Sequence, residues 1–276
     1  MTALRYIKFS PASNTTAFVV DDVPGTVRPA LARGLMGVLD VEQVGFVVPS
    51  ENGSPRAPSE RMEMMGGEFC GNASRCFASF LALGGEDIWE RGPRPLKAAL
   101  EVSIEVSGHS GLLRAAVTPG GNDLGCHVAV AMPVPCGITA GSDAAAGQYS
   151  LVSFEGIRHL VLWDLESEQM TVGQTLAEDL GITAGDYGLM FMGGGSTRMT
   201  PFVSIAATGT EVWESSCGSG TVAVACALAH REGRSVEALA LAQPGGTLTA
   251  SAVWDGSTVL DAALSGEIAL VSWGYV

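Results

Sequence analysis

The sequence predicts a mixed α/β protein made of two similar halves. Short apolar strands alternate with a few helices, and the order of elements in residues 1–132 returns in residues 133–265. Each half also contains one helix that is apolar on nearly all sides, residues 73–83 in the first and 221–230 in the second. A helix of that kind is buried on every side. We therefore expect each half to be a barrel-like sheet curled around its apolar helix.

The elements of the first half follow from apolar alternation and from turn residues at their ends. The predicted helices are 27–39 and 73–83. The predicted strands are 6–9, 17–20, 44–48, 61–64, 100–106, 112–117 and 127–132. In strand 100–106 the apolar residues alternate with Glu101, Ser103 and Glu105, which predicts a half-buried strand with these three on the outer face. Residues 51–59 are rich in Pro, Gly and Ser, so they are expected to form an exposed loop.

The second half repeats this order after a segment rich in Ala, Gly and Pro, residues 133–147, which we interpret as the crossover. Its predicted helices are 171–180 and 221–230. Its predicted strands are 151–154, 157–163, 187–192, 202–206, 239–242, 247–253 and 259–263, and a last strand, 268–275, closes the chain.

The composition is typical of a compact globular chain. Of its 276 residues 47% are hydrophobic and 16% are charged, and the net charge is −14. An acidic chain repels phosphates, so nucleic acid is not expected as a partner. Neither a signal peptide nor an apolar run of 18 residues is found, which predicts a cytoplasmic protein that does not enter a membrane. Six cysteines in that compartment are expected to be reduced, with three disulfides as the weaker alternative.

Two short cysteine motifs, one in each half, indicate the function. The first reads EFCGNA over residues 68–73, and the second reads ESSCGSG over residues 214–220. Each cysteine is followed by glycine, a small polar residue and a predicted helix. Cys70 and Cys217 therefore stand at helix starts, where unpaired N–H groups and the helix dipole lower the pKa of a thiol.

Two opposed thiols are suited to racemising an amino acid without a cofactor. Inversion removes a proton from one face of the α-carbon and adds a proton to the other, so two acid/base groups must flank that carbon. A thiol, with an unperturbed pKa of about 8.5, can hold or release its proton near neutral pH. The two helix starts would also bind the α-carboxylate. Neither a phosphate-binding loop nor zinc-ligand spacing is found, so we expect no cofactor and no metal.

The other cysteines and the histidines are assigned no chemistry. Cys76 and Cys226 point away from the motif cysteines on their helices and are expected in the core. Cys126 and Cys136 flank a strand. The four histidines are His109, His127, His159 and His230. None of them stands in a motif, which disfavours a thiol hydrolase. A non-catalytic amino-acid-binding protein remains the alternative from another class.

The two motifs resemble those of the cofactor-independent, two-cysteine racemases and epimerases, which include diaminopimelate epimerase and proline racemase. The resemblance implies two similar α/β domains, each a mostly antiparallel, barrel-like sheet around a central helix. It implies that the last strand returns to the first domain. The domains would then be 1–132 plus 266–276, and 133–265, with Cys70 and Cys217 as the acid/base pair in the cleft between them. It also implies a possible homodimer.

A closer resemblance is to the histidine racemases of opine-metallophore biosynthesis. It rests on residues 10–16, 42–46, 68–73, 213–221 and 243–246. It implies that the amino acid is bound by Asn14, Glu42, Gln43, Gly71, Asn72, Gly218 and Ser219. Diaminopimelate epimerase has a Glu-Arg pair shortly before its second cysteine, whereas residues 208–214 contain no arginine. Histidine or another amino acid with a single α-centre is therefore the expected substrate, with diaminopimelate as the alternative.

Overall fold

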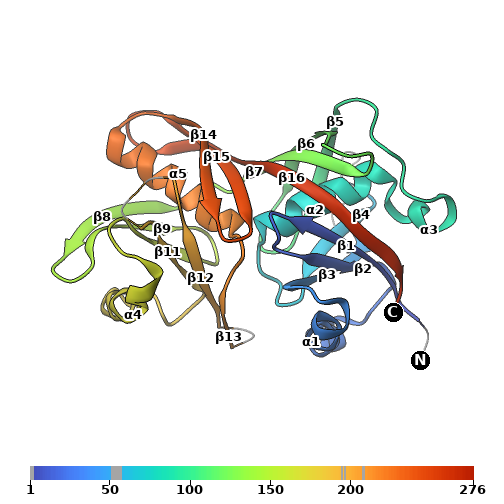
Figure 1. Ribbon diagram of the computed structural model, residues 1–276, viewed down its shortest axis with the longest axis horizontal. Helices are drawn as coiled ribbons and strands as arrows, with labels where there is room; N and C mark the ends of the chain where they lie inside the picture. Colours follow the sequence, from blue (N-terminus) through green and yellow to red (C-terminus); the bar gives the residue numbers. More distant parts are fainter. Residues whose placement is uncertain (1–2, 51–57, 194, 196, 207–208) are drawn as a thin grey trace. The chain divides into compact units, whose positions relative to one another are not determined.

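A computed structural model describes residues 3–50, 58–193, 195, 197–206 and 209–276 of the chain (Figure 1). The chain divides into two compact units. Unit 1 comprises Met1–Ala131 and Ser265–Val276, and unit 2 comprises Met132–Leu264. Most of the predicted loop 51–59, the middle of the triple glycine 193–195 and the start of the stretch 208–214 lie outside the described residues.

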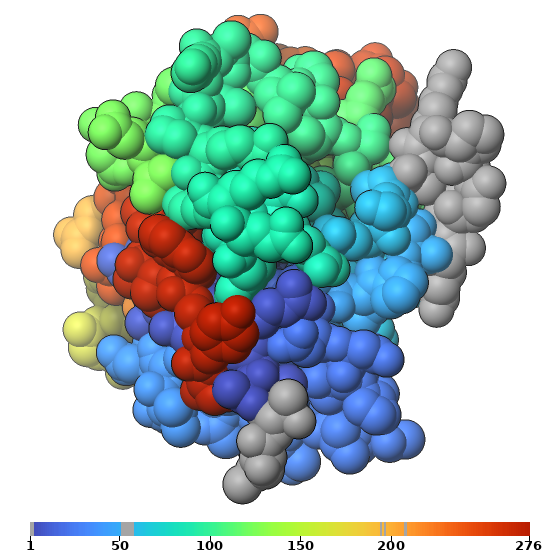
Figure 2. Space-filling model, turned by 90° about the vertical axis from the view of Figure 1, so that its right-hand side faces the viewer, coloured from blue at the N-terminus to red at the C-terminus, as the bar shows by residue number. Residues whose placement is uncertain are grey.

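The sheet of unit 1 has the strand order β4-β3-β2-β1-β16-β7-β6-β5. Its strands are β1 (Arg5–Pro11), β2 (Thr16–Val19), β3 (Gln43–Pro49), β4 (Glu60–Met64), β5 (Leu100–Glu105), β6 (Leu112–Pro119), β7 (Gly125–Met132) and β16 (Val259–Tyr275). Strands β2 and β3 are parallel, whereas β1–β2, β3–β4, β5–β6, β6–β7 and β1–β16 are antiparallel. In Figure 2 the red C-terminal strand lies against the blue N-terminal segment, as the pairing of β1 with β16 requires.

The two ends of this sheet order meet, which makes the sheet barrel-like. A bridge joins Met62 of β4 to Val106, directly after β5, and the Ser107 amide donates to the Met62 carbonyl at 2.9 Å. Helix α2 (Gly71–Leu83) packs against β1, β2, β5 and β6. It is buried along nearly its whole length, so the sequence correctly predicted an apolar helix inside a curled sheet.

The described residues of unit 1 form two further α-helices. Helix α1 (Arg28–Leu39) packs on β3 and buries Ala32 and Leu35 against Phe46. A short helix, α3 (Ile88–Arg91), follows α2 and was not predicted.

Unit 2 also surrounds an apolar helix. Its main sheet has the order β13-β12-β11-β10-β9-β8, in which only β10 and β11 are parallel. The strands are β8 (Gly137–Asp143), β9 (Gly147–Ser153), β10 (Arg158–Leu162), β11 (Tyr187–Phe191), β12 (Thr200–Ile205) and β13 (Thr210–Trp213). Helix α4 (Met170–Asp179) connects β10 to β11. Helix α5 (Gly218–Glu232) packs against this sheet and against the hairpin of β14 (Val236–Gln243) and β15 (Gly246–Trp254).

Several boundaries differ from the sequence prediction. The predicted crossover 133–147 contains strand β8, because a hairpin with β9 satisfies the backbone of this small-residue segment. The predicted strands 259–263 and 268–275 are one continuous strand, β16. Strand β13 was missed. Glu105 was predicted on the outer face of β5 but is buried, where its carboxylate accepts a hydrogen bond from the Ser50 hydroxyl. Among the described residues, no helix is both long and apolar enough to span a bilayer.

The Phe77→Ala variant tests the core around α2. Phe77 is completely buried and lies 6.0 Å, between ring centroids, from both Phe18 and Phe80. We expect the free energy of unfolding to fall by about 3–5 kcal/mol in urea titrations, because truncation loses apolar burial and leaves a cavity. The exposed Val38→Ala variant is the control and should change it by less than about 0.5 kcal/mol. Equal effects of the two variants would contradict a core centred on α2.

Candidate active site

Both motif cysteines cap the central helix of their unit. Cys70 is the N-cap of α2 and Cys217 is the N-cap of α5, and both have extended backbone conformations. The Cys70 sulfur accepts a hydrogen bond from the Ala73 amide at 3.4 Å, and the Cys217 sulfur accepts one from the Gly220 amide at 3.4 Å. The structure therefore places both thiols at helix starts, as the sequence predicts.

The backbone around the two cysteines is also matched. Four residues after each cysteine, a hydroxyl donates back to the cysteine carbonyl: Ser74 to Cys70 at 2.8 Å, and Thr221 to Cys217 at 2.6 Å. The first-turn amides of a helix have no intrahelical acceptor, so both sites present donors to a bound anion.

Cys70 ends a chain of polar side chains that begins at Glu42. The Cys70 thiol donates to Gln43 Oε1 at 3.0 Å, and Gln43 Nε2 donates to Asn14 Oδ1 at 2.9 Å. Asn14 Nδ2 in turn donates to Glu42 Oε2 at 2.8 Å. Asn14 is completely buried, and within unit 1 its side-chain amide forms two hydrogen bonds of this polar chain, one to Glu42 and one to Gln43. The sequence singled out all four residues, and the structure connects them.

A buried arginine lies one turn into α2. Arg75 is completely buried, and its Nη2 donates to Asn72 Oδ1 at 2.7 Å. Among the described residues, Nε and Nη1 of Arg75 have no hydrogen-bond partner. Burial lowers the pKa of Arg75 to about 10, whereas negative charge on the Cys76 or Cys70 sulfur would raise it. Arg75 is thus a buried positive charge that favours an anion at the start of α2, and the sequence analysis missed it.

The backbone before Cys70 is fixed by the segment after β5. The Ser107 hydroxyl donates to the Glu68 carbonyl at 2.8 Å and accepts from the Met64 amide at 3.0 Å. Gly108 has φ +69°, and a Cβ there would lie 2.2 Å from the Phe69 nitrogen. Only glycine allows this approach, so Gly108 sets the position of the Cys70 motif.

Cys217 has different neighbours. It is buried, and its sulfur lies 3.6 Å from the Ser219 hydroxyl, which lies 2.9 Å from Nε2 of His159. Burial raises the pKa of the Cys217 thiol well above its usual value, the Glu214 carboxylate raises it further, and the Ser219 hydroxyl lowers it. His159 is completely buried, and this burial lowers its pKa to about 4. The imidazole next to Ser219 is therefore neutral.

His159 corrects the sequence analysis, which found no histidine associated with a cysteine motif. It lies 58 residues before Cys217 on β10, so the sequence spacing gave no signal. It reaches the cysteine through one hydroxyl. A second residue, Gln243, also fixes the Cys217 motif. Its Oε1 accepts a hydrogen bond from the Cys217 amide at 2.8 Å, and its Nε2 donates to Thr221 Oγ1 at 2.9 Å.

The remaining cysteines have the expected environments. Cys76 and Cys226 are completely buried, and burial raises the pKa of Cys226 to about 12. Cys126 is buried and Cys136 is exposed. All six cysteines are free thiols in the structure.

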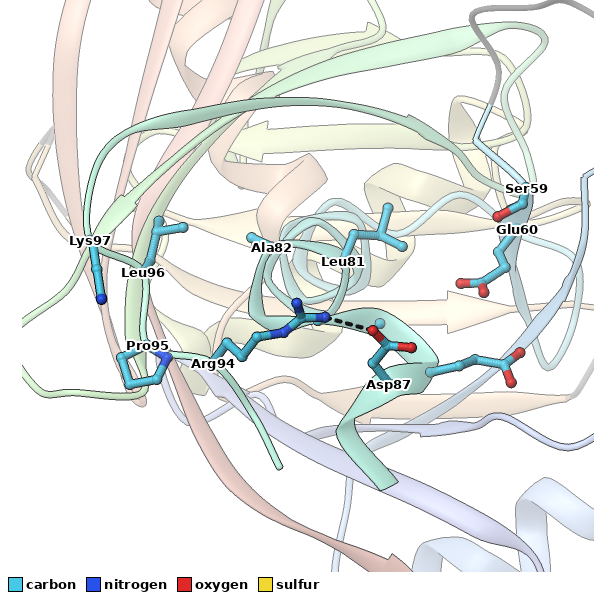
Figure 3. Close-up of a pocket in the computed structure, with 12 residues that line it drawn as sticks. Ser59, Glu60, Leu81, Ala82, Asp87, Arg94, Pro95, Leu96 and Lys97 are labelled. Carbon is cyan, nitrogen blue, oxygen red and sulfur yellow. Dashed lines mark hydrogen bonds and ion pairs between the residues drawn. The ribbon is translucent and has the colours of Figure 1, made fainter. Parts of the chain in front are cut away.

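Surface cavities among the described residues include one in each unit. One, of about 520 Å³, lies at the C-terminal end of α2, where Leu81 and Ala82 form part of its wall and Arg94 donates to Asp87 (Figure 3). Because Cys70 caps the other end of α2, this cavity is separate from the cysteine. The other, of about 310 Å³, adjoins the Cys217 motif and is lined by Ser167, Glu168, Thr200, Trp213, Glu214, Ser215 and Pro244.

The chain has the fold of solved racemases and epimerases. A solved hydroxyproline epimerase from Agrobacterium vitis, with bound trans-4-hydroxy-L-proline, has the same fold with a TM-score of 0.66 and 14% identity. The alignment covers 100% of this chain and 91% of that one.

The sequence comparisons then identify the family. The profile described as "Histidine racemase CntK N-terminal domain" matches residues 3–276, so the chain belongs to this family. A histidine racemase of Fusobacterium nucleatum is 28% identical over 254 residues, 89% of this chain and 87% of that protein. The histidine racemase of Staphylococcus aureus is 22% identical over 98% of this chain and 96% of that protein. The protein is therefore an isomerase, an amino-acid racemase.

The Gly108→Ala variant tests the support of the Cys70 motif. We expect kcat/KM for racemisation to fall by about 10- to 100-fold, because the new Cβ displaces the backbone that leads to Cys70. Gly121→Ala is the control, since a Cβ there meets open space. Kinetics by chiral chromatography measure both variants. Unchanged activity in Gly108→Ala would show that this support is not needed.

The buried His159 predicts a pH dependence of stability. Because its pKa is about 4 in the fold against an ordinary value of 6.5, the unfolded chain binds this proton more tightly. The contribution of the neutral His159 imidazole to the free energy of unfolding is complete above pH 6.5. It is lost as the pH falls towards 4, with a slope of at most about 1.4 kcal/mol per pH unit.

Urea unfolding at a series of pH values checks this contribution. The His159→Gln variant should show a shallower loss of stability than the wild type between pH 6.5 and 4. His127→Gln, at a partly exposed position on β7, is the control and should follow the wild type. Parallel curves for His159→Gln and the wild type would refute a buried neutral imidazole.

Proposed function

We propose that this protein is a histidine racemase that inverts its substrate with two thiols, Cys70 and Cys217, and needs no cofactor. The observation that carries the proposal is the matched geometry of the two cysteines. Each is the N-cap of a buried helix, and each sulfur accepts a first-turn amide at 3.4 Å. Family membership supports histidine as the substrate.

In the proposed reaction, the α-carbon of the amino acid lies between the two sulfurs. One cysteine, as thiolate, removes the α-proton from one face, and the other, as thiol, delivers its own proton to the opposite face. One proton is taken up and one is released, so the products are the inverted amino acid and an enzyme with the two roles exchanged. The opposite enantiomer then uses the exchanged form.

The helix starts would stabilise the charge that develops on the substrate. The first-turn amides, with Gly71 and Asn72 in unit 1 and Gly218 and Ser219 in unit 2, would hold the carboxylate. When the α-proton leaves, negative charge spreads into that carboxylate, and fixed N–H dipoles already point at it. Arg75 donates to Asn72 Oδ1, which orients the Asn72 side chain at the start of α2.

The cavity beside Cys217 supports histidine over diaminopimelate. Its described lining includes the half-exposed indole of Trp213 and the carboxylates of Glu168 and Glu214, and it includes no lysine or arginine. An indole face and carboxylates suit the N–H groups of an imidazole. The described lining offers no cationic partner to the distal carboxylate of diaminopimelate. A cytoplasmic location, expected from the sequence, and a role in opine-metallophore biosynthesis, implied by the resemblance, complete the proposal.

Deuterium incorporation and chiral chromatography test this function. In D₂O the wild type should exchange the α-proton of L- and D-histidine and convert each to the racemate. Diaminopimelate and the other common amino acids should react at least about tenfold more slowly. Efficient inversion of diaminopimelate, with none of histidine, would refute the substrate.

Single-cysteine variants test the mechanism. Cys70→Ser and Cys217→Ser should each lower inversion by at least about 10³-fold, because a serine hydroxyl is a much weaker acid than a thiol. Any remaining exchange should be confined to one enantiomer, and to opposite enantiomers in the two variants. Cys136→Ser, at an exposed cysteine outside the motifs, is the control and should retain full activity. Inversion that survives either motif substitution would refute two-thiol catalysis.

A further inference from the structure

The polar chain that ends at Cys70 has a defined direction. A carboxylate has no hydrogen to donate, so the Asn14 atom that faces Glu42 Oε2 at 2.8 Å must be the amide nitrogen. The Asn14 oxygen then faces Gln43, which must donate its own Nε2–H at 2.9 Å. The Gln43 oxygen is therefore the atom that lies 3.0 Å from the Cys70 sulfur.

A carbonyl oxygen at this distance favours a protonated sulfur. The contact is a hydrogen bond only while Cys70 carries its proton, because the carbonyl has none to give. A thiolate at the same place would face the negative end of the amide dipole. A hydrogen bond made by the neutral form of an acid raises its pKa.

We infer that Glu42 is a positioning residue that acts on Cys70 through Asn14 and Gln43: by fixing the direction of both amides, it holds Cys70 as the proton-donating thiol. This inference deepens the proposed function and rests on the acid/base role of Cys70 in it. It gives Asn14, Glu42 and Gln43 a task besides contact with the amino acid.

The backbone around the chain fixes its side chains. The Glu42 amide donates to the Thr15 carbonyl at 3.0 Å and to the Thr15 hydroxyl at 3.2 Å, and the Gln43 amide donates to the same carbonyl at 3.1 Å. Directly before Asn14, Ala12 and Ser13 have φ values of 48° and 60°, a conformation that is unfavourable for both residues. This turn presents Asn14 to both of its partners.

Arg75 opposes the chain. Titratable groups near Cys70 among the described residues of unit 1 include Glu42 before β3, Glu68 in the preceding loop, His109 against Phe69, and Arg75 and Cys76 on α2. Arg75 is the buried cation among them, and it stabilises a thiolate. Burial raises the pKa of Cys76, which stays a thiol. Two opposing effects therefore act on the Cys70 thiol. The Arg75 cation favours loss of its proton, and the oriented amide of Gln43 favours its retention.

The experiment measures ionisation of Cys70 in the free protein. Alkylation by iodoacetamide is followed across a pH series, and the Cys70 peptide is quantified by mass spectrometry because exposed Cys136 also reacts. In Glu42→Gln the amide at position 42 can donate to Asn14, so the chain can reverse and present Gln43 Nε2–H to the sulfur. We expect the alkylation midpoint to fall by about one pH unit.

A double-mutant cycle separates the directed chain from the charge of Glu42. Gln43→Met removes the acceptor and leaves that charge, so it should also lower the midpoint. In the Gln43→Met background, Glu42→Gln should then cause no further shift. Glu68→Gln, which removes a nearby charge outside the chain, is the control and should shift the midpoint by less than half as much.

Three results would overturn the inference: an unchanged or raised midpoint in Glu42→Gln, a shift of equal size in the Gln43→Met background, or an equal shift in Glu68→Gln. Thermal melts establish that each variant is folded. Because alkylation needs no substrate, this test is independent of racemase activity. Failure of the proposed function would appear in the deuterium experiment. Failure of the inference about Glu42 would appear in the alkylation experiment.

Discussion

The hydrogen bond from a first-turn amide to a cysteine sulfur is the interaction on which both cysteine motifs depend. It makes Cys70 and Cys217 the caps of α2 and α5, so each sulfur is part of a helix terminus. Capping needs a side-chain acceptor close to the backbone, and burial of the helix then fixes that acceptor. The barrel-like sheets serve this purpose, because they enclose the helices and hold their N-termini in place.

The duplicated backbone supports two unlike environments. Both cysteines share the cap, the back-bonding hydroxyl and the buried helix. Cys70 has an amide chain and a buried cation, whereas Cys217 has a hydroxyl, a neutral imidazole and the Glu214 carboxylate. In a two-base reaction the groups exchange the same proton roles but meet opposite faces of a chiral substrate. Identical surroundings are therefore not required.

The sequence predicted the parts of this structure that local pattern determines. The apolar helices, most strands and the helix-start position of both cysteines follow from periodicity and from the residues after each cysteine. The long strand β16 and the hairpin strand β8 were misjudged, because small residues such as those at 137–141 give no clear alternation. Local pattern could not find His159, Arg75 and Gly108. Their roles arise from contacts across the fold or from burial, which the spacing of residues does not encode.

Strand β16 has a consequence for how the protein is made. Its residues from Ser265 onward belong to unit 1, where they lie between β1 and β7 in the sheet order. Residues translated after the whole of unit 2 therefore complete the sheet that contains β1. A nascent chain that has not yet released the residues from Ser265 onward leaves the edges of β1 and β7 unpaired, so unit 1 cannot finish folding before unit 2 has been translated.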